Sequence, residues 1–356
     1  MTERYIDILR SSAIFLFLTS GAFAQESKKI PDTNANTLNT IVEKHLSDGM
    51  KTYDAMGAAG AIMNAKTGEI VASVSLHRNP AETYNRVTDG SYTISSVSKL
   101  TTIAMGLESG AFKMESRVDA RFPLKIGRYT IHDYYAQKRK LNLSEAFVYS
   151  SNIAIARIGL KVGGSYQSLF LNAMGQQDPI NNGVSVGGLP IYPSESGLLS
   201  DATTAFGQSV MLTPLHALSA VATLTSADGR VVAPTFLKDQ KTQGIRVVST
   251  ETSKRLRELL RLNADIGSAR SVDLQGYQVG GMTSTADKVK DGKFTPDHVI
   301  TTVIATVPSN DPQFIFLTLL DEPKATEATK GFHTAAWNAG PVTAGIMKEA
   351  LPALLK

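Results

Sequence analysis

Short apolar runs near both ends of the chain enclose a long middle part in which apolar residues recur at helical spacing. Residues 58–63 and 69–74 are strand-like, and the polar segment between them includes Gly68, which can adopt a positive φ. This pattern predicts a β-hairpin. Three further strand-like runs come late in the chain: 277–279, 299–307 and 314–320. The sequence therefore predicts strands from both ends of the chain.

The predicted helices lie mainly between these strands. Apolar positions recur every three or four residues in 38–46 and again from Leu100 to Leu107, before Gly110, which predicts two amphipathic helices. Residues 117–217 have the pattern of short helices and loops. A small-residue helix and a C-terminal helix are predicted from the same periodicity, near 211–228 and over 341–351. Strands from both ends around a helical middle indicate an α+β fold, with one mixed sheet and an inserted helical lobe.

The first 24 residues have the pattern of a secretory signal peptide. A short segment with basic residues precedes the apolar run 13–18, and Ala22-Phe23-Ala24 supplies a small-x-small cleavage site. The run is shorter than the roughly 20 apolar residues of a membrane-spanning helix, so we expect cleavage and export to the periplasm. Glu3 and Asp7 weaken the basic segment, which leaves an uncleaved membrane anchor as the alternative.

Residues 25–36 are polar and predict a short linker, which leaves 37–356 as one large domain. The net charge is only +4, and no basic run is interleaved with aromatic residues, so we expect no nucleic-acid partner. There is no cysteine, which excludes disulfides and thiolate chemistry. The histidines show no metal-ligand spacing, and no nucleotide-binding glycine loop is present. We therefore expect neither a metal nor another cofactor.

Ser96-Val97-Ser98-Lys99 begins one of the predicted helices and contains a candidate nucleophile. A serine hydroxyl needs a base, and residues three apart share a helix face. Lys99 can be that base if burial lowers its pKa from about 10.4. The N–H groups at the helix N-terminus favour a developing oxyanion. The alternative is a capping serine followed by a surface lysine.

Two further polar segments follow in order. Ser150-Ser151-Asn152 offers a hydroxyl that can relay a proton and an amide that can hold a substrate carbonyl, although Ser and Asn also cap helices. Met282-Thr283-Ser284-Thr285 follows a strand-like run and is expected at the edge of a cleft. A literal Lys-Thr-Gly at 66–68 precedes the nucleophile and lies in the predicted hairpin. We interpret that segment as turn residues.

In this order the three segments resemble the S-x-x-K, S-x-N and K-T-G motifs of serine acyltransferases that react with penicillin. The chain is similar, from about residue 38 to 356, to the transpeptidase domain of class B penicillin-binding proteins, in particular the FtsI-like peptidoglycan D,D-transpeptidases of cell division. Further matching segments are 64–72, 206–208, 213–215 and 276–277. The resemblance implies a five-stranded, mainly antiparallel sheet flanked by helices, with the active site between the sheet and the helical lobe.

The resemblance also implies roles for individual residues. Ser96 would be the acylated nucleophile, Lys99 its base and Ser150 a proton relay, with the N–H groups of Ser96 and Thr285 as the oxyanion hole. The implied substrate-binding residues are Asn152, Met282, Thr283, Ser284 and Thr285. The reaction implied is attack on a D-Ala-D-Ala peptidoglycan stem peptide, followed by transfer to an amine. The implied partners are these peptides, β-lactams, and proteins of cell division or cell-wall synthesis.

The chain departs from the family pattern at four positions. Ser95 and Ser98 stand where the family usually has Gly and Phe, and Ser284 replaces a glycine. Met282 replaces the lysine that meets the substrate carboxylate. Losing one charge-assisted hydrogen bond costs about 1.5–3 kcal/mol, or roughly 10- to 150-fold, so we expect impaired acyl transfer.

Two other hypotheses are compatible with the sequence. The chain could be a non-catalytic FtsI-like paralogue that serves as a scaffold for cell-wall peptides or division proteins. It could also hydrolyse β-lactams or D-Ala peptides, for which Glu145 lies near the second motif in sequence. A scaffold should be indifferent to changes at Ser96 and Met282, whereas an enzyme should not.

Overall fold

The computed structural model describes residues 33–240, 243–290 and 293–355. The predicted signal peptide and the first part of the predicted linker, residues 25–32, lie outside these ranges. Among the described helices, none combines the length and the apolar character that a membrane span requires. The α-helices are α2 (Thr33–Thr52), α3 (Ser95–Glu108), α4 (Leu143–Val148), α5 (Asn152–Val162), α6 (Gly164–Ala173), α7 (Leu198–Phe206), α8 (Pro214–Thr225), α9 (Thr250–Ile266) and α10 (Ala339–Leu354), and the 3-10 helices are η1 (Arg270–Val272) and η2 (Ala335–Trp337).

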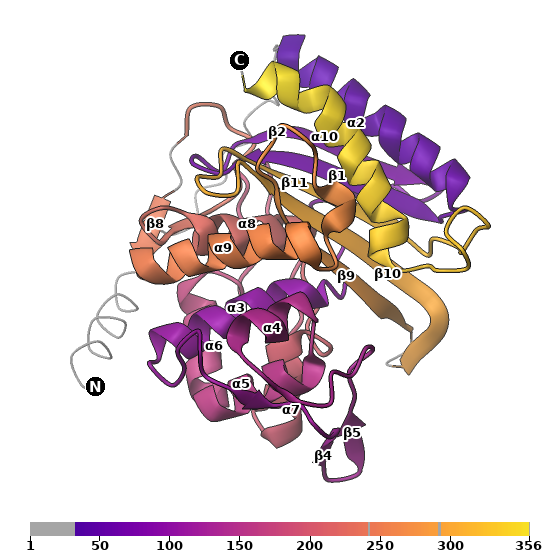
Figure 1. Ribbon diagram of the computed structural model, residues 1–356. Coiled ribbons are helices and arrows are strands. Elements are labelled where there is room, and N and C mark those ends of the chain that lie inside the picture. The colour runs from indigo at the N-terminus through magenta and orange to yellow at the C-terminus, as the bar shows by residue number, and fades with distance from the viewer. Residues whose placement is uncertain (1–32, 241–242, 291–292, 356) are drawn as a thin grey trace.

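A five-stranded antiparallel sheet in the order β2-β1-β11-β10-β9 lies at the centre of the molecule (Figure 1). Its strands are β1 (Gly57–Asn64), β2 (Ile70–His77), β9 (Gly280–Lys290), β10 (Lys293–Val307) and β11 (Phe314–Asp321). Three two-stranded sheets are formed by β3 (Val118–Asp119) with β6 (Lys140–Leu141), β4 (Leu124–Ile126) with β5 (Tyr129–Ile131), and β7 (Arg230–Val232) with β8 (Gln243–Arg246). The predicted sheet from both ends of the chain is thus confirmed; its strand pairs are all antiparallel, so the mixed sheet expected from the pattern alone is not.

The first hairpin forms as its sequence predicts. Strands β1 and β2 pair directly, and Gly68 in the connecting turn has a φ of 82°. The N–H groups of Lys66 and Thr67 donate to the Asn64 side chain, at 2.9 and 3.1 Å. The literal Lys-Thr-Gly is therefore part of a turn.

The strand predicted at residues 277–279 is wrong. The N–H of Tyr277 donates to the Leu274 carbonyl in a turn, and the strand begins only at Gly280. The two glycines at its start are poor strand formers by composition. Close packing in the sheet outweighs this low strand preference. A Cβ on Gly280 would lie only 2.7 Å from Thr306 Oγ1 on the paired strand β10, so the position favours glycine. Consequently the third motif lies within the edge strand β9.

Helices cover both faces of the sheet (Figure 1). Helices α2 and α10 pack on one face, and α3, α8 and α9 lie on the other. In α2, Leu38, Val42 and Leu46 recur every four residues and are at most 5% exposed, which is the predicted apolar stripe. The helix begins at Thr33, about one turn before Leu38, the first residue of this stripe. Its first residues therefore lie within the stretch predicted as a linker.

Helix α9 is the largest element that the sequence interpretation missed. The Ser249 hydroxyl accepts a hydrogen bond from the Thr252 N–H, so it caps the helix. Leu256, Leu259 and Leu260 form the buried face. Asn263 Nδ2 donates to the Gly281 carbonyl at 2.9 Å, which ties the helix to β9. The capping serine and the leucine spacing are both visible in the sequence.

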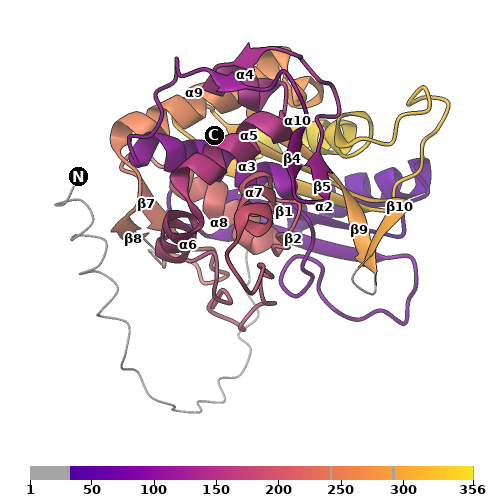
Figure 2. The same ribbon diagram turned by 90° about the horizontal axis from the view of Figure 1, so that it is seen from below.

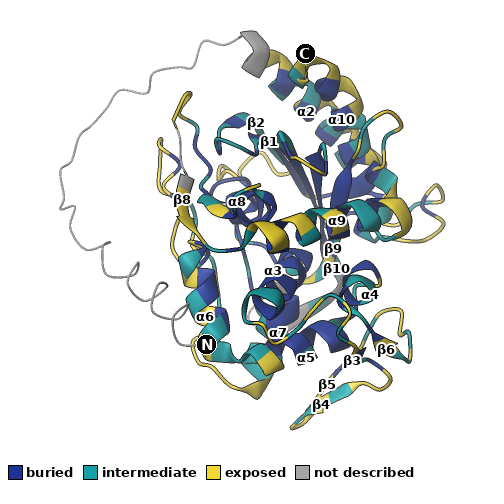
Figure 3. Cartoon of the chain, turned by 60° about the vertical axis from the view of Figure 1, so that its left-hand side comes forward, coloured by how far each residue is buried: buried dark blue, intermediate teal, exposed yellow. Residues whose placement is uncertain are grey.

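The inserted helical lobe comprises α4 to α7 with the small hairpin β4–β5. It lies below the sheet in Figure 1 and faces the viewer in Figure 2. Helix α3 passes between this lobe and the sheet, and ten of its 14 residues are buried, from Ser96 to Gly106 (Figure 3). The fold thus places the first motif in the layer where the two parts meet.

Candidate active site

Ser96 lies in the first turn of α3 and is 8% exposed. The N-cap position is occupied by Ile94, which makes no side-chain capping bond. The Val97 N–H donates to the Ile94 carbonyl at 3.3 Å, whereas the N–H of Ser96 has no side-chain capping acceptor and can receive one from a ligand. Among the described residues, none is hydrogen-bonded to Ser96 Oγ.

Lys99 is buried one turn further along the same helix, at 6% exposure. Its Nζ donates to Ser150 Oγ at 2.6 Å and to the Ser150 carbonyl at 3.0 Å. Burial lowers the pKa of Lys99 from 10.5 to about 8, and the charge of Asp133 opposes part of that shift. The alternative of a surface lysine is wrong. The structure joins the first motif to the second through this side chain.

The second motif lies between α4 and α5. Ser150 has a φ of 52°, a left-handed conformation that is uncommon for a residue with a side chain. Ser151 caps α5 by accepting from the Ala154 N–H, and its hydroxyl donates to Asp133 at 2.7 Å. The capping interpretation therefore applies to Ser151, whereas Ser150 contacts Lys99.

Asp133 is a positioning residue that the sequence interpretation missed. Its other oxygen accepts from the Ile153 N–H at 2.9 Å. The neighbouring His132 carbonyl accepts from Asn152 Nδ2 at 3.0 Å. One short segment therefore fixes both Ser151 and Asn152, although no motif marks it.

Glu145 has a structural role at the start of α4. One carboxylate oxygen accepts from the Asn142 N–H at 2.9 Å, and the other accepts from Arg139 at 2.8 Å. Asn142 in turn accepts from the Glu145 N–H, which completes a capping box. Because both oxygens are engaged in this cap, the arrangement gives no support to Glu145 as a deacylating base.

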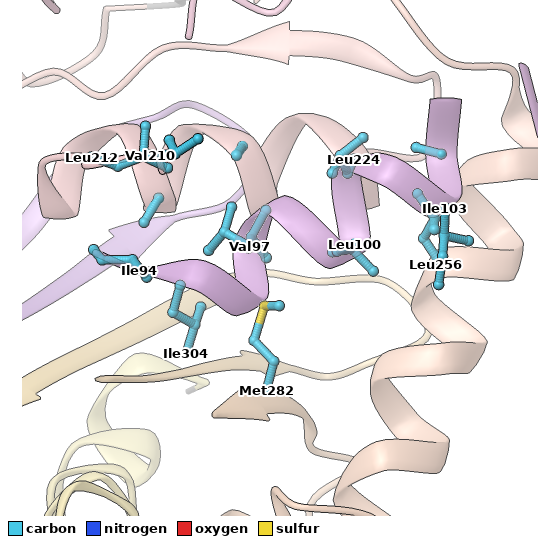
Figure 4. Packing of buried hydrophobic residues seen from close by; sticks show 14 of the residues in the cluster. Ile94, Val97, Leu100, Ile103, Val210, Leu212, Leu224, Leu256, Met282 and Ile304 are labelled. Atoms are coloured by element: carbon cyan, nitrogen blue, oxygen red, sulfur yellow. The ribbon is translucent and has the colours of Figure 1, made fainter. Parts of the chain in front are cut away.

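The third motif follows the alternation of a β-strand. Met282 and Ser284 are 2% and 4% exposed, and Met282 packs beneath α3 near Val97 (Figure 4). Thr283 and Thr285 take the other side of the strand. Thr283 donates to Ser268 Oγ at 2.7 Å, and Thr285 Oγ1 accepts from the Ala335 N–H at 2.9 Å.

A narrow cleft, with no room for a water molecule, separates the start of α3 from β9. Its lining residues are Ile94, Ser96, Val97, Met282, Thr283, Ser284, Thr302 and Ile304. Ser95 Oγ and Ser284 Oγ share a hydrogen bond of 3.1 Å between α3 and β9. Two of the positions at which the chain departs from the family pattern are therefore in direct contact.

One buried histidine, His216, lies outside the three motifs. His216 is buried, with Nδ1 at 2.7 Å from Thr213 Oγ1 and Nε2 at 2.9 Å from the Asp178 carbonyl. Desolvation on burial lowers its pKa. Within these ranges, no three His, Asp or Glu side chains gather closely enough to hold a metal ion.

Gly207 holds the start of α3 in place from the lobe side. It ends α7 with a φ of 85°, and a Cβ there would lie 2.5 Å from Ser95 Cα and 2.6 Å from the Ser95 carbonyl oxygen. Gly110 follows α3 with a φ of 71°, but a Cβ at that residue would have no atom of its surroundings within 4 Å. The two glycines thus share a left-handed backbone conformation, but only at Gly207 would an added Cβ collide with a neighbouring residue.

We expect Gly207→Ala to lower the free energy of unfolding by more than Gly110→Ala does. Both variants incur about 1–2 kcal/mol for a left-handed residue with a Cβ, and only Gly207→Ala must also displace Ser95. Urea unfolding of the two variants measures the difference. Equal losses of stability would show that this contact does not constrain α3.

Comparison with known proteins gives concordant results. The family profile described as "Penicillin binding protein transpeptidase domain" matches residues 58–347. A protein of Caulobacter vibrioides, "Probable peptidoglycan D,D-transpeptidase FtsI", is 30% identical over 339 residues, covering 89% of this chain and 57% of that protein. "Stage V sporulation protein D" of Bacillus subtilis is 29% identical over 355 residues, with coverages of 89% and 52%. The chain thus spans a little more than half the length of these relatives.

Solved structures agree on the fold. The transpeptidase domain of penicillin-binding protein 3 from Burkholderia pseudomallei superposes with a TM-score of 0.80 at 21% identity, covering 92% of this chain and 98% of that chain. Penicillin-binding protein 2X from Streptococcus thermophilus gives a TM-score of 0.77 at 21% identity, covering 89% and 51%. The expected α+β fold, with its antiparallel sheet and helical lobe, is confirmed.

Proposed function

Because the chain belongs to the penicillin-binding protein transpeptidase family, in its class B branch, we propose that it is a serine acyltransferase acting on D-Ala-D-Ala stem peptides of peptidoglycan. Penicillin would acylate the same serine. The observation that carries this proposal is the buried Lys99, whose pKa is lowered to about 8 and whose Nζ lies 2.6 Å from Ser150 Oγ. A lysine that is buried on the helix of Ser96 and bonded to Ser150 suits proton transfer better than it suits stability.

We propose an acylation step in which Lys99 acts on Ser96, one turn away on the same helix, although its Nζ is bonded to Ser150 in the structure. Neutral Lys99 takes the proton of Ser96, and Ser96 Oγ forms a bond to the penultimate D-Ala carbonyl carbon. Ser150 accepts a hydrogen bond from Lys99, so it gives its own proton to the leaving amine as the C–N bond breaks, and Lys99 passes the proton taken from Ser96 on to Ser150. An amine of a neighbouring stem peptide then attacks the ester and takes over the acyl group.

The negative charge on the carbonyl oxygen needs hydrogen-bond donors. The N–H of Ser96, in the uncapped first turn of α3, is one. The N–H of Thr285 on β9 would be the other. Strand β9 has a neighbour on one side only, and an edge strand leaves alternate N–H groups unpaired.

A substrate in the cell wall requires export, for which residues 1–24 are the proposed signal peptide and the periplasm the proposed location.

The proposed activity is impaired, because Met282 provides no charge at the third motif. The alternative function is a non-catalytic FtsI-like scaffold for cell-wall or division proteins. It is favoured by the Ser95–Ser284 hydrogen bond, which joins the two sides of the cleft at 3.1 Å.

Covalent labelling with a fluorescent penicillin tests the proposal. We expect an adduct on Ser96, located by peptide mass spectrometry, and its complete loss in Ser96→Ala. Ser98→Ala is the matched control, because Ser98 lies on the same helix and is half-buried without forming part of the proposed machinery. A folded wild-type protein that forms no adduct at high penicillin and long incubation would contradict the proposal and favour the scaffold.

A further inference from the structure

Aromatic side chains are exposed around the small hairpin of the helical lobe. Four of them belong to residues 117–140, which include β3 and the β4–β5 hairpin and which we call the hairpin segment. The fifth directly follows α4. Their exposed fractions range from 42% to 73%, and the residues are Phe122, Tyr129, Tyr134, Tyr135 and Tyr149. Exposed apolar side chains that gather in this way are typical of an interaction surface.

The aliphatic residues of the same hairpin are packed into the protein. Ile131 is 6% exposed, and Leu124 and Ile126 pack, partly buried, against the larger hydrophobic core. A hairpin that simply lacked a core would expose its aliphatic and aromatic residues alike. The exposure of the aromatic rings is therefore selective, which favours a binding role.

The hairpin segment also concentrates positive charge. Its seven Lys or Arg residues and two Asp residues give a net charge of +5, whereas the whole chain carries +4. Four of these cations are exposed, and none of the described carboxylates forms an ion pair with them; they are Lys125, Arg128, Lys138 and Lys140. Exposed cations without acidic partners attract an anionic ligand.

Two arginines bring positive charge directly to the aromatic rings. The Arg128 guanidinium lies 5.2 Å from the centroid of the Tyr129 ring, and the Arg139 guanidinium lies 5.5 Å from that of Tyr149. Such cation–π contacts favour defined ring orientations. A ligand at this surface therefore meets aromatic rings and positive charge side by side.

The surface adjoins the second motif at two places. Tyr134 directly follows Asp133, whose carboxylate positions that motif. Tyr149 directly precedes Ser150. The hairpin itself extends from the lobe and is largely exposed (Figures 1 and 3). A long ligand that reaches the active site and continues along the lobe would therefore contact this surface.

The polymer that carries the proposed stem peptides has matching chemistry. Aromatic rings stack against the C–H faces of sugars, and Lys and Arg bind carboxylates through charge-assisted hydrogen bonds. A peptidoglycan strand offers sugar rings along its backbone and a carboxylate at the end of each D-Ala-D-Ala stem. A bilayer matches less well, because membrane-surface segments insert Trp, Phe and Leu side chains. Here four of the five exposed rings are tyrosines, and the aliphatic residues are packed inward.

We propose that the hairpin segment and Tyr149 bind the glycan strand of peptidoglycan beside the stem peptide that enters the active site. The aromatic rings contact the sugars, and the four exposed cations bind carboxylates of neighbouring stems. The choice of this polymer rests on the proposed function. Binding requires no acyl transfer, so it can be measured after the nucleophile has been removed.

The affinity for uncross-linked peptidoglycan strands with intact D-Ala-D-Ala stems tests the aromatic contacts. The measurement is fluorescence anisotropy on Ser96→Ala, which cannot be acylated at this serine. Adding Tyr134→Ala and Tyr135→Ala should raise the Kd about tenfold or more, because two stacking surfaces are lost. Leu198→Ala is the matched control, since Leu198 is 70% exposed on the same lobe, and it should change the Kd by less than about twofold. Equal Kd values for the tyrosine variant and this control would overturn the proposal.

Lys138→Gln combined with Lys140→Gln tests the cations. We expect roughly tenfold weaker binding of the same strands, and a smaller loss of affinity when salt is raised, because fewer charges remain to be screened. Lys254→Gln with Lys348→Gln is the matched control, because it removes two exposed charges on α9 and α10. Equal losses of affinity in the two double variants would show a general attraction for polyanions and overturn the proposed site.

Two further probes identify the partner. A neutral β-1,4-linked N-acetylglucosamine oligomer should bind more weakly than the strands, and its binding should depend on Tyr134 and Tyr135 but not on Lys138 and Lys140. Binding of this oligomer that is unaffected by the tyrosine substitutions would contradict the sugar contact. Vesicles that contain phosphatidylglycerol should not bind. Vesicle binding that is lost in the tyrosine variant, without strand binding, would overturn the proposal in favour of a membrane surface.

Penicillin labelling separates this proposal from the proposed function. With Ser96 intact, the tyrosine substitutions should change the labelling rate by less than about threefold, because the contacts of Asp133 with the second motif use neither ring. A larger loss of labelling would contradict a surface distinct from the active site. Strand binding without labelling would defeat the acyltransferase proposal alone, and labelling without strand binding would defeat the glycan surface alone.

Discussion

We expect Lys99→Met to lower the rate at which penicillin acylates Ser96 by about 10²- to 10⁴-fold, the usual contribution of a general base. The thioether fills nearly the same space as the lysine side chain but cannot accept a proton. It also removes the two hydrogen bonds to Ser150. Rapid-quench labelling of the two proteins measures the change.

The pH dependence of the acylation rate tests whether the protonation state of Lys99 controls the reaction. The neutral form of Lys99 is the base and its pKa is about 8, so the wild-type rate rises about tenfold per pH unit below that value and levels off above it. This step should be absent in Lys99→Met. Lys161→Met, at an exposed position in the last turn of α5, should retain the wild-type rate and profile. A wild-type rate that stays constant between pH 6 and 9 would contradict Lys99 as the base.

Arg86→Met should lower the free energy of unfolding by about 3–5 kcal/mol, the usual loss when one partner of a buried ion pair is removed. Arg86 is 2% exposed and donates to Asp321, itself 5% exposed, at 2.7 Å. The variant leaves that buried carboxylate with Lys288 as its remaining cationic partner. Urea unfolding at neutral pH gives the loss.

A surface pair provides the matched control for this measurement. Lys44 and Glu349 join α2 to α10 at 2.7 Å, but their side chains are 56% and 40% exposed. Lys44→Met should cost less than about 1 kcal/mol, because water screens the pair. Similar losses in Arg86→Met and Lys44→Met would show that the buried pair does not hold the segment before α3 onto the sheet.

Local sequence signals predicted much of the fold because they act over short distances. The first hairpin, the strands near 299–307 and 314–320, and helix α3 follow from periodicity and turn residues. The short strands β3 to β8, one central strand and helix α9 were not predicted correctly. The strand predicted at 277–279 was wrong, because these residues follow a turn and the strand begins only at Gly280. Gly280 and Gly281, which have a low intrinsic strand preference, belong to β9 because they pack closely against β10 and its neighbours. Helix α9 was missed although its capping serine and leucine stripe are visible.

The sequence predicted which residues form the candidate active site, but it did not predict most of the hydrogen bonds between them. The order of the three motifs identifies Ser96, Lys99 and Ser150, but it does not indicate that Asp133 positions the second motif. Nor does the sequence show what Ser150 and Ser151 each contact. The structure separates them, because Ser151 caps α5 whereas Ser150 accepts a hydrogen bond from Lys99.

The sequence by itself determined the family, the order of the motifs, and the absence of a lysine at position 282. Only the tertiary structure decided that Lys99 is buried, with a lowered pKa, and that Ser95 and Ser284 meet between α3 and β9. The physical reason is that side-chain desolvation and contacts across 189 residues depend on how separate elements pack. Local sequence patterns predict the conformation of each segment, but they do not predict how distant segments pack against one another.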